Sequence, residues 1–528
     1  SNALASLTSG ARNLAIGYQA LRQSDVCDDS IAIGYQALGG TDTGTNNKNI
    51  AIGNYALDAN MTHNVQNIAI GTNALTNLAG SGGISNVFVG NTAGQSLTNA
   101  DYNTGMGEGV MGESASNAIT GNYNTAMGSL AMYNAEGSVV GNTAVGYQNL
   151  FDITTGTYNV AMGYNTAQNI TTGSANIAIG TDAMSAPTVP VTSIAIGQNA
   201  MGSLQAGQAF TDVIAIGLDA VRGSASSTDA INGTIGIGYD ALTSITTGVQ
   251  NTAIGYQSQD ANTTGSWNTT LGYGSGGALV AGSNSNTAIG AGSLSAGNNA
   301  STDNNTCVGS ASGDVITTGH TNTIIGADSD PSANSGTNQA TLGYGVTGQA
   351  DNSVTLGNAS VDAVYMAQDS GAIVHTAGIQ FPASQVANGG ANVLDDYEEG
   401  TYTVTLGNGA TGATYSTSTN IGAYTKIGQI VHVTTRVIAS EDHTGTDGYL
   451  YMSLPFGHTA NEFFSVIVYY NNLGTAGDLV VGVPATSGSG GTQLHFQYLT
   501  KNGTATTINS SALSNGDEIR FQVTYRVA

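Results

Sequence analysis

A short alternating pattern of apolar and small residues recurs along most of the chain. Its unit reads Asn-x-Ala-Ile-Gly and is often continued by Tyr-Gln-Ala-Leu. With the Gly of each unit taken as an anchor, the unit occurs 20 times between Gly17 and Gly357, at spacings of 14 to 21 residues. A constant strand joined by turns of varying length predicts a parallel β-solenoid of about 20 rungs, one rung per repeat.

The two apolar columns of the repeat are expected to point into the rung. The residue before the anchor is Ile, Val, Leu or Met in every copy, and the residue two positions earlier is usually Ile, Val, Leu or Thr, as at Ile31 and Thr143. Side chains alternate along a strand, so both positions lie on one face. The Ala between them, as at Ala15 and Ala253, would then face outward. A column of Ala there indicates close packing by another coil and favours an oligomer.

The remaining columns predict how the rungs stack and bend. Asn stands four residues before the anchor in most copies, and stacked Asn side chains can hydrogen-bond along a column and to turn backbone. The anchor Gly suits a bend with positive φ or a close backbone approach. A small residue followed by Leu or Met, as at Ala20 and Leu21, predicts a second short inward segment. Representative positions are Asn13, Ile16, Gly17, Asn67, Gly71, Asn159, Gly163, Asn251 and Gly255.

A different pattern follows the last repeat and predicts an antiparallel β domain. Seven short alternating runs, separated by Gly, Asn and Asp, indicate a β-sandwich of the jelly-roll kind. The runs are 402–406, 430–438, 449–454, 464–470, 479–483, 493–499 and 518–527. The chain is therefore predicted to be all-β. Its parts are a tag-like remnant at 1–3, a solenoid shaft at 4–360, a linker at 361–394 and a C-terminal domain at 395–528.

The Asn-x-Ala-Ile-Gly repeat over residues 13–357 resembles the head repeat of trimeric autotransporter adhesins. That resemblance implies a trimer of left-handed parallel β-rolls. Most repeats here carry about three more residues than those heads use, so handedness and trimer packing come only from the resemblance.

The region 350–430 resembles the distal domains of phage tail fibres. The resemblance rests on Leu394-Asp395-Asp396-Tyr397-Glu398-Glu399-Gly400-Thr401-Tyr402, on Gly422 to Gly428, and on Val354 to Asn358 leading to Phe381-Pro382-Ala383. It implies a trimeric virion fibre whose tip faces a receptor or directs assembly. A surface autotransporter would also need a coiled-coil stalk and a membrane anchor, and the sequence shows neither heptads nor an anchor. A phage tail fibre on the virion is therefore the leading expectation, and an extracellular bacterial surface adhesin is the alternative.

Charge and hydropathy exclude two classes of partner. The chain has 9 Lys and Arg against 34 Asp and Glu, a formal net charge of −25, with no basic cluster to neutralise nucleic-acid phosphates. The longest apolar run, at 463–470, has strand length and falls short of the ~20 residues of a membrane helix. We expect neither nucleic-acid binding nor membrane insertion.

No pattern indicates an enzyme or a cofactor. Nucleophile elbows, phosphate loops and zinc signatures are absent from the sequence. A polysaccharide-cleaving tailspike would need paired carboxylates across a groove, and the acidic residues show no repeated pairing. An ice-binding surface would need outward Thr rows, whereas Thr143, Thr252 and Thr287 are expected to face inward. A divalent cation remains possible at Glu441, Asp442 and Asp447, in a loop that otherwise reads as a solvated hairpin.

The partners expected are two further copies of the chain and a glycan or protein receptor on a host cell. Tyr follows the anchor in eight copies, and this regularity indicates a structural role. The candidates for receptor contact are Trp267, His443, Tyr449, Tyr451, His458, Tyr469 and Tyr470.

Overall fold

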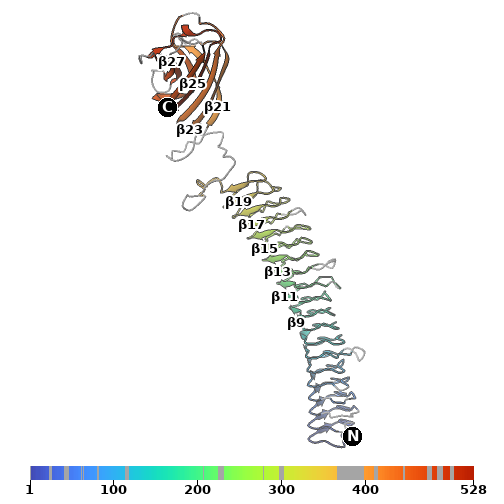
Figure 1. The fold of residues 1–528 in the computed structure, drawn as a ribbon. Coiled ribbons are helices and arrows are strands. Elements are labelled where there is room, and N and C mark those ends of the chain that lie inside the picture. The colour runs from blue at the N-terminus through green and yellow to red at the C-terminus, as the bar shows by residue number, and fades with distance from the viewer. Residues whose placement is uncertain are drawn as a thin grey trace. The chain divides into compact units, whose positions relative to one another are not determined.

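The computed structural model of the chain contains two compact units, Ser1–Ser370 and Gly371–Ala528 (Figure 1). The structure describes residues 2–527 apart from 23–25, 41–46, 61, 64, 80–81, 113–117, 206, 208, 224–230, 278, 297–301, 366–397, 410–413, 444–445, 472–478, 485–490 and 500–504. Within these residues it holds one 3-10 turn, η1 (Ser510–Ala512), and no α-helix. The expected all-β class is confirmed.

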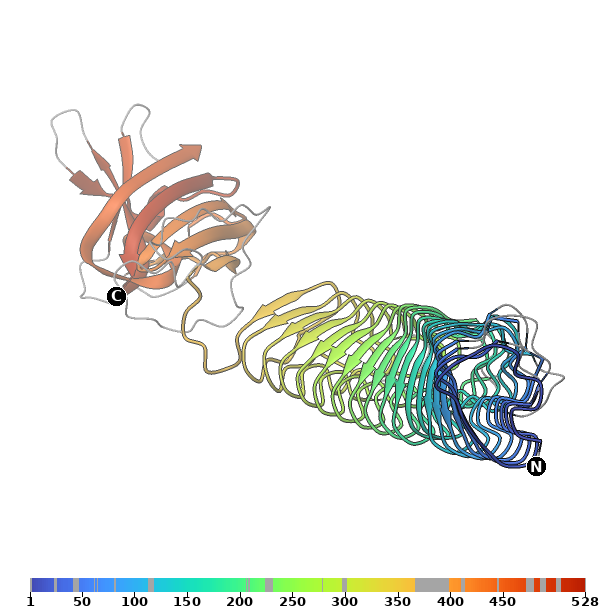
Figure 2. The ribbon, with the colours of Figure 1, turned by 90° about the horizontal axis from the view of Figure 1, so that it is seen from below.

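The first unit is a parallel β-solenoid of twenty short strands. Each strand pairs in parallel with the next one along the chain, so Ile177, Ala178 and Ile179 of one rung lie beside Ile194, Ala195 and Ile196 of the following rung. Figure 2 shows the successive rungs stacked upon one another. The strands are β1 (Leu14–Ile16), β2 (Ile31–Ile33), β3 (Ile50–Ile52), β4 (Ile68–Ile70), β5 (Val87–Val89), β6 (Thr104–Met106), β7 (Thr125–Met127), β8 (Thr143–Tyr147), β9 (Val160–Tyr164), β10 (Ile177–Ile179), β11 (Ile194–Ile196), β12 (Ile214–Ile216), β13 (Ile235–Ile237), β14 (Thr252–Ile254), β15 (Thr269–Leu271), β16 (Thr287–Ile289), β17 (Thr306–Val308), β18 (Thr323–Ile325), β19 (Ala340–Leu342) and β20 (Val354–Leu356).

The strands face the opposite way from the sequence-based prediction. The second residue of each strand points inward, as at Ala178, which is 1% exposed, while Ile177 and Ile179 beside it are 37% and 36% exposed. A thin rung leaves little room behind its strand. Leu21 and Leu38 from the segment after the anchor fill that space and are fully buried. A small residue on the strand lets those larger side chains pack, so the Ala column belongs to the core.

Exceptions to the Ala column show how tightly this core is packed. Phe88 takes the Ala position in β5, and a Cβ on Gly94 or Gly105 would lie 2.8 Å or 2.4 Å from its ring carbon Cδ1. The same compensation recurs where Cys307 replaces Ala, because a Cβ on Gly313 would lie 2.6 Å from the Cys307 sulfur. A larger residue on the strand therefore goes with glycine in the residues packed against it.

The anchor glycines are required by the close approach of neighbouring rungs. Gly255 has φ +139°, and a Cβ there would lie 2.2 Å from the carbonyl oxygen of Gly272 in the next rung. No side chain fits at that distance without a backbone shift. The predicted bend at Gly17, Gly71, Gly163 and Gly255 is confirmed, with φ between +130° and +144°.

The predicted Asn ladder is present inside the solenoid. Asn159 donates from Nδ2 to Asn142 Oδ1 at 3.0 Å and to the Gly173 carbonyl at 2.8 Å. The same arrangement repeats at Asn67, which donates to the Gly83 carbonyl and to Asn49 Oδ1 at 3.3 Å. Each Asn thus bonds the rung before it and the turn of the rung after it, which satisfies buried backbone that a turn would leave unpaired.

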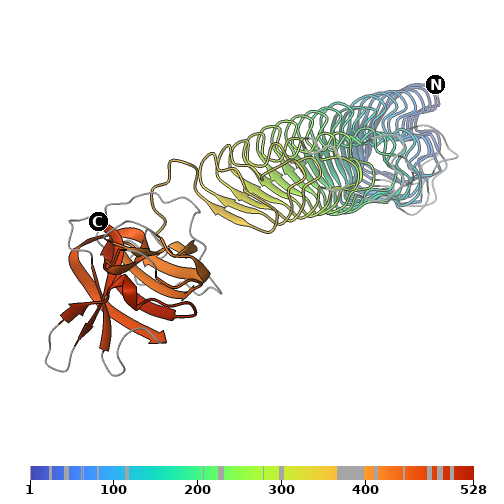
Figure 3. The same ribbon diagram turned by 90° about the horizontal axis from the view of Figure 1, so that it is seen from above.

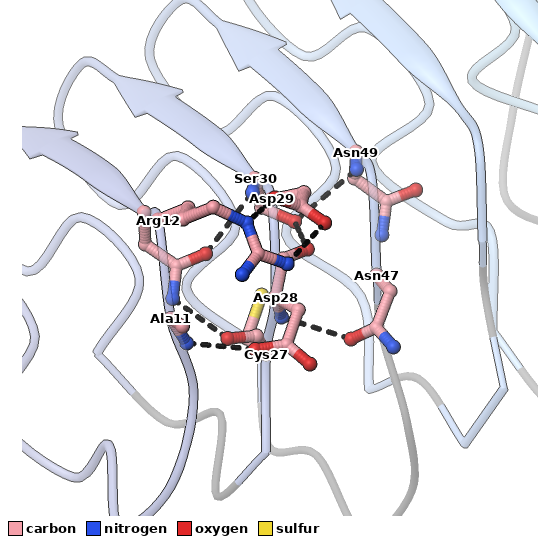
Figure 4. Close-up of polar contacts among 9 residues, drawn as sticks. Ala11, Arg12, Cys27, Asp28, Asp29, Ser30, Asn47 and Asn49 are labelled. Atoms are coloured by element: carbon pink, nitrogen blue, oxygen red, sulfur yellow. Dashed lines mark hydrogen bonds and ion pairs between the residues drawn. The ribbon is translucent and has the colours of Figure 1, made fainter.

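The second rung uses a shorter side chain for the same purpose (Figure 4). Ser30 stands in the Asn position: its N–H donates to Asn13 Oδ1 at 3.0 Å, and its Oγ accepts from the Asn49 N–H at 3.2 Å. Outside this ladder, the Arg12 guanidinium forms an ion pair with Asp29 of the next rung, with one N–O distance of 2.8 Å.

The second unit is built from antiparallel strands, as expected (Figure 3). Their order in the sheet is β21-β23-β24-β29-β25-β27-β26, with β22 paired to β25 and β28 paired to β27. The strands are β21 (Glu398–Thr403), β22 (Leu406–Asn408), β23 (Thr417–Ile427), β24 (Ile430–Ala439), β25 (Leu450–Asn471), β26 (Leu479–Pro484), β27 (Gly491–Leu499), β28 (Ala505–Thr507) and β29 (Glu518–Val527). The runs predicted at 449–454 and 464–470 are one long strand, β25, and strand β23 was not predicted.

The long strand β25 joins two layers around one core. Its first part pairs with β22 and β27, and its last part, from Phe463 to Asn471, pairs with β29. The rings of Phe496 from β27 and Phe521 from β29 meet with centroids 6.3 Å apart. Both are buried, together with Val433 of β24. This two-layer packing places the alternate residues of β23, β24 and β29 on an exposed face.

Candidate functional site

The solenoid has an outer strand face, formed by the first and third residues of each strand. None of the third residues is buried, and all are apolar: Ile16, Ile33, Ile52, Ile70, Val89, Met106, Met127, Val145, Met162, Ile179, Ile196, Ile216, Ile237, Ile254, Leu271, Ile289, Val308, Ile325, Leu342 and Leu356. Neither position of any strand carries a charged residue. An uninterrupted apolar column facing outward is the pattern of an interface.

The outward Thr residues overturn one argument of the sequence analysis. Thr143, Thr252 and Thr287 are the first residues of β8, β14 and β16, so they lie on the outer strand face and not inside the rung. Their inward orientation was the reason given against ice binding, and that reason is wrong. The Thr residues form one row, at the first position of the strands, beside the apolar column at the third position. The outer strand face therefore has one row of hydroxyl groups and not two.

The Tyr residues near the anchors form exposed stacks along the solenoid. The ring centroids of Tyr239 and Tyr256 are 5.0 Å apart, and those of Tyr256 and Tyr273 are 5.1 Å apart, with nearly parallel planes. Tyr147 and Tyr164 stack in the same way at 5.2 Å. Each ring has its neighbour one rung away, which agrees with the structural role expected from their regular recurrence.

Trp267 is a separate exposed aromatic on the turn before β15. Its side chain is 56% exposed and its Nε1 donates to Gln250 Oε1 of the preceding rung at 2.6 Å. The residue has φ +60°, as Gln250 has φ +55° at the equivalent position. Trp267 therefore remains an accessible receptor candidate, held in one orientation by its neighbour.

Three of the aromatic candidates in the C-terminal domain are part of its packing. Tyr451 is 7% exposed, and a Cβ on Gly407 would lie 2.4 Å from its ring, so β22 passes directly over it. Tyr449 packs with its centroid 4.1 Å from that of His495. His443 lies with Nδ1 2.7 Å from the Tyr415 hydroxyl. These contacts give Tyr449, Tyr451 and His443 structural roles, while the side chains of His458 and Tyr470 lie outside the described residues.

The three carboxylates proposed for a divalent cation serve separate backbone groups. Glu441 accepts from the Ser416 N–H at 2.6 Å, Asp442 from the Asn515 N–H at 2.7 Å, and Asp447 from the Ser511 N–H at 2.9 Å. Within the described part of the chain, no three His, Cys, Asp or Glu side chains come together in a way that could hold a metal ion. The carboxylates act as loop caps in this arrangement.

One exposed row in the C-terminal domain was not found from the sequence. The strand registers align Thr403, Ile421, Arg436, Arg520 and Tyr469 across five neighbouring strands. These residues come from β21, β23, β24, β29 and β25 in that order. We call this set the arginine row. Of its members only Tyr469, which is 58% exposed, was a candidate in the sequence analysis.

The sequence feature that could have indicated this row is the alternation of apolar and polar residues in β24 and β29. Arg436 and Arg520 fall on the exposed phase of their strands, as the buried Val437 and Phe521 beside them indicate. The two arginines are far apart in the chain, and only the pairing of β24 with β29 brings them together. A single sequence does not contain that register.

No family model matches this chain, and no curated protein matches it. Among the residues that the structure describes, no helix has the length and apolarity to cross a membrane.

Proposed function

We propose that the chain is the shaft and tip of a homotrimeric fibre, a phage tail fibre that attaches the virion to its host cell. The observation that carries the oligomer is the outward apolar column of the outer strand face, which a lone solenoid would leave in water. Assignment to a phage rests on the resemblance of residues 350–430 to tail-fibre tips, and the C-terminal β domain is the proposed receptor-binding end.

The size of the outer strand face supports such an assembly. Twenty strands spaced about 4.8 Å apart give a length of about 95 Å, and three residues give a width of about 10 Å. The resulting area of about 950 Å² per chain is comparable to the ~800 Å² that each partner contributes to a standard interface. Three parallel copies turning this face to a common axis would cover the apolar column over its whole length.

Solution mass is the first test of the proposal. Light scattering after size exclusion should give three times the monomer mass of 52.9 kDa. A double variant, Ile254→Asp with Ile289→Asp, places charges on the outer strand face and should dissociate the assembly. The matched control is Asn304→Asp with Asn338→Asp, which adds the same charge on exposed turn residues with φ +57° and +51°. A monomeric parent chain would overturn the trimer, and thermal hysteresis would then be the next measurement.

Two further measurements separate the alternatives. Antibodies to the chain should label virion tails in electron micrographs, whereas label on bacterial envelopes would favour the surface adhesin. A tailspike enzyme would release reducing sugar ends from host polysaccharide, and the fibre proposed here should release none.

A further inference from the structure

Three members of the arginine row, Ile421, Arg436 and Arg520, line an open hollow on the exposed face of the C-terminal sheet. The hollow has a volume of about 550 Å³ and is lined by Thr419, Ile421, Ala423, Thr434, Thr435, Arg436 and Arg520. That volume lies within the range of about 300–1,000 Å³ that small-molecule sites occupy. It therefore has room for a sugar residue, which is smaller than a typical drug.

The hollow carries a positive charge in a strongly acidic protein. Arg436 and Arg520 donate from Nε to the same atom, Glu518 Oε1, at 2.5 Å and 2.7 Å. These hydrogen bonds hold the pKa of Glu518 below its ordinary value, so its carboxylate stays ionised. Two guanidinium groups and one carboxylate leave one net positive charge at the hollow, where a chain of net charge −25 would otherwise repel anions.

The hydrogen-bond donors of Arg436 and Arg520 are only partly occupied by Glu518. Their side chains are 48% and 52% exposed, whereas that of Glu518 is 16% exposed. A guanidinium has five N–H donors arranged in a fork, and one carboxylate oxygen cannot satisfy two such forks. Glu518, two residues from Arg520 on the same face of β29, thus orients both guanidinium groups while part of each remains open to solvent.

An aromatic ring lies beyond Arg520, on the next strand from the hollow. Tyr469 lies next to Arg520 in the strand register, and the Arg520 guanidinium carbon is 5.7 Å from the centre of its ring. With Tyr469 58% exposed, the ring keeps an accessible surface. Within the hollow, the exposed apolar side chain of Ile421 lies beside hydroxyl groups and paired arginines. This combination suits a sugar that also bears an anion, because the apolar surface packs on the sugar carbons while the arginines bind the charge.

We infer that this hollow binds the carboxylate-bearing sugar of an anionic host polysaccharide. The sugar carboxylate takes the solvent-facing edges of Arg436 and Arg520, its hydroxyl groups face Thr434, and its carbon face packs against Ile421, which lines the hollow. This inference rests on the proposed receptor-binding function, and it names the chemical class of the receptor and the residues that select it.

The test compares two sugar probes that differ at one substituent, which is charged in one and neutral in the other. The full-length protein is titrated with methyl glucuronoside and with methyl glucoside, in which a hydroxymethyl group replaces the carboxylate, and binding is followed by ligand-observed NMR. The glucuronoside should bind at least about tenfold more tightly, and added salt should weaken it. Acetate is the third probe, since equal binding of acetate would mean that the hollow accepts any carboxylate and would overturn the sugar site.

Variants then assign the binding to the arginine row. Arg436→Gln with Arg520→Gln should abolish the preference for glucuronoside, and Arg436→Lys should weaken binding because it keeps the charge and loses the fork. Arg526→Gln, an exposed arginine on the same strand as Arg520, is the matched control and should leave binding unchanged. Equal glucuronoside binding by the double variant and the parent would refute the inference. A drop in solution mass of that variant would instead assign the face to contacts between copies.

Cell binding separates this site from the wider proposal. If the parent protein adheres to host cells and the double arginine variant adheres equally well, the sugar site fails while the fibre function stands. If the parent adheres to no host cell, the receptor-binding function itself fails.

Discussion

The backbone N–H of Asn176 donates a hydrogen bond to the side-chain oxygen of Asn159, 3.1 Å away in the preceding rung. The Asn176 side-chain amide donates to that same oxygen at 2.9 Å. One buried oxygen thus accepts from the backbone N–H and from the side-chain amide of the next Asn, and the pattern repeats in neighbouring rungs. The ladder makes each rung depend on its neighbour, as solenoid stability requires.

Removal of one Asn should therefore open the solenoid locally. Asn159→Ala leaves the Asn176 N–H without its acceptor and the Gly173 carbonyl without its donor, and we expect a loss of about 3 kcal/mol. Asn159→Ser should lose only about 1 kcal/mol, because Ser193 shows that a serine can hold this position, accepting from the Val213 N–H at 3.3 Å. Hydrogen exchange of the peptides covering β9 and β10, read by mass spectrometry, checks both variants. Equal protection in the two would contradict the ladder's role.

The anchor glycines make a sharper prediction. Gly255→Ala places a Cβ 2.2 Å from the Gly272 carbonyl oxygen, so the rungs must separate, and we expect a loss of about 3 kcal/mol or more. Gly274→Ala is the matched control, since its φ is +59° and a Cβ there meets nothing within 4 Å. That change should lose only about 1 kcal/mol, the strain of a left-handed residue. Denaturant unfolding compares the two, and similar losses would count against the close-approach argument.

The pair Phe88 and Gly94 allows a test of core complementarity. Phe88→Ala should lose about 3–5 kcal/mol because it leaves a cavity, and Gly94→Leu alone should also destabilise because the new side chain meets the Phe88 ring. The double variant restores the Ala and Leu pair that occurs at Ala69 and Leu75 in the preceding rung. The double variant should lose less stability than the two single variants together, and we expect this difference in the free energy of unfolding to be at least about 2 kcal/mol. Simple additivity in denaturant unfolding would show that the two positions do not share one space.

The sequence predicted those features that depend on contacts between equivalent positions of neighbouring repeats. The repeat length, the Asn ladder through Asn67 and Asn159, and the bends at Gly71 and Gly163 follow because each column meets itself one rung away. In such a stack, a residue contacts the equivalent residue of the next repeat. The residue type at one position of the repeat therefore identifies both partners of that contact. The strands of the C-terminal domain followed from alternation, since polar and apolar residues alternate clearly in 430–438 and 518–527.

The facing of the solenoid strands was predicted wrongly for a physical reason. The alternation of side chains shows which residues share a face of the strand. It identifies the buried face only when the opposite face is polar. Here Ile177 and Ala178 are both apolar, and the larger residue was taken as the buried one. Asn13 and Ala15 are two residues apart and therefore share a face, so a buried Asn ladder would have placed Ala inside. The arginine row was missed because strand registers between β24 and β29 are tertiary information.

Burial of Asp58 predicts that the shaft becomes less stable as the pH rises. Burial raises the pKa of Asp58 to about 6, above the ordinary value of 3.8. A group whose pKa is raised by folding favours the folded state most when it is protonated in both states, at pH below 4, and that contribution is lost as the pH rises through 6.

Asp58→Asn removes this titration and should stabilise the shaft at pH 7. A shift of about two pKa units corresponds to ~2.7 kcal/mol, and solvent screening of this half-buried group reduces the expected gain to about 1 kcal/mol. At pH 3 the parent and the variant should unfold at nearly the same denaturant concentration, because the parent carboxyl is then largely protonated in both the folded and the unfolded state. Denaturant midpoints measured from pH 3 to pH 8 check the prediction. A gain that is constant across this range would show that the amide stabilises by packing or hydrogen bonding, and a loss at pH 7 would show that the Asp58 carboxylate is a stabilising group.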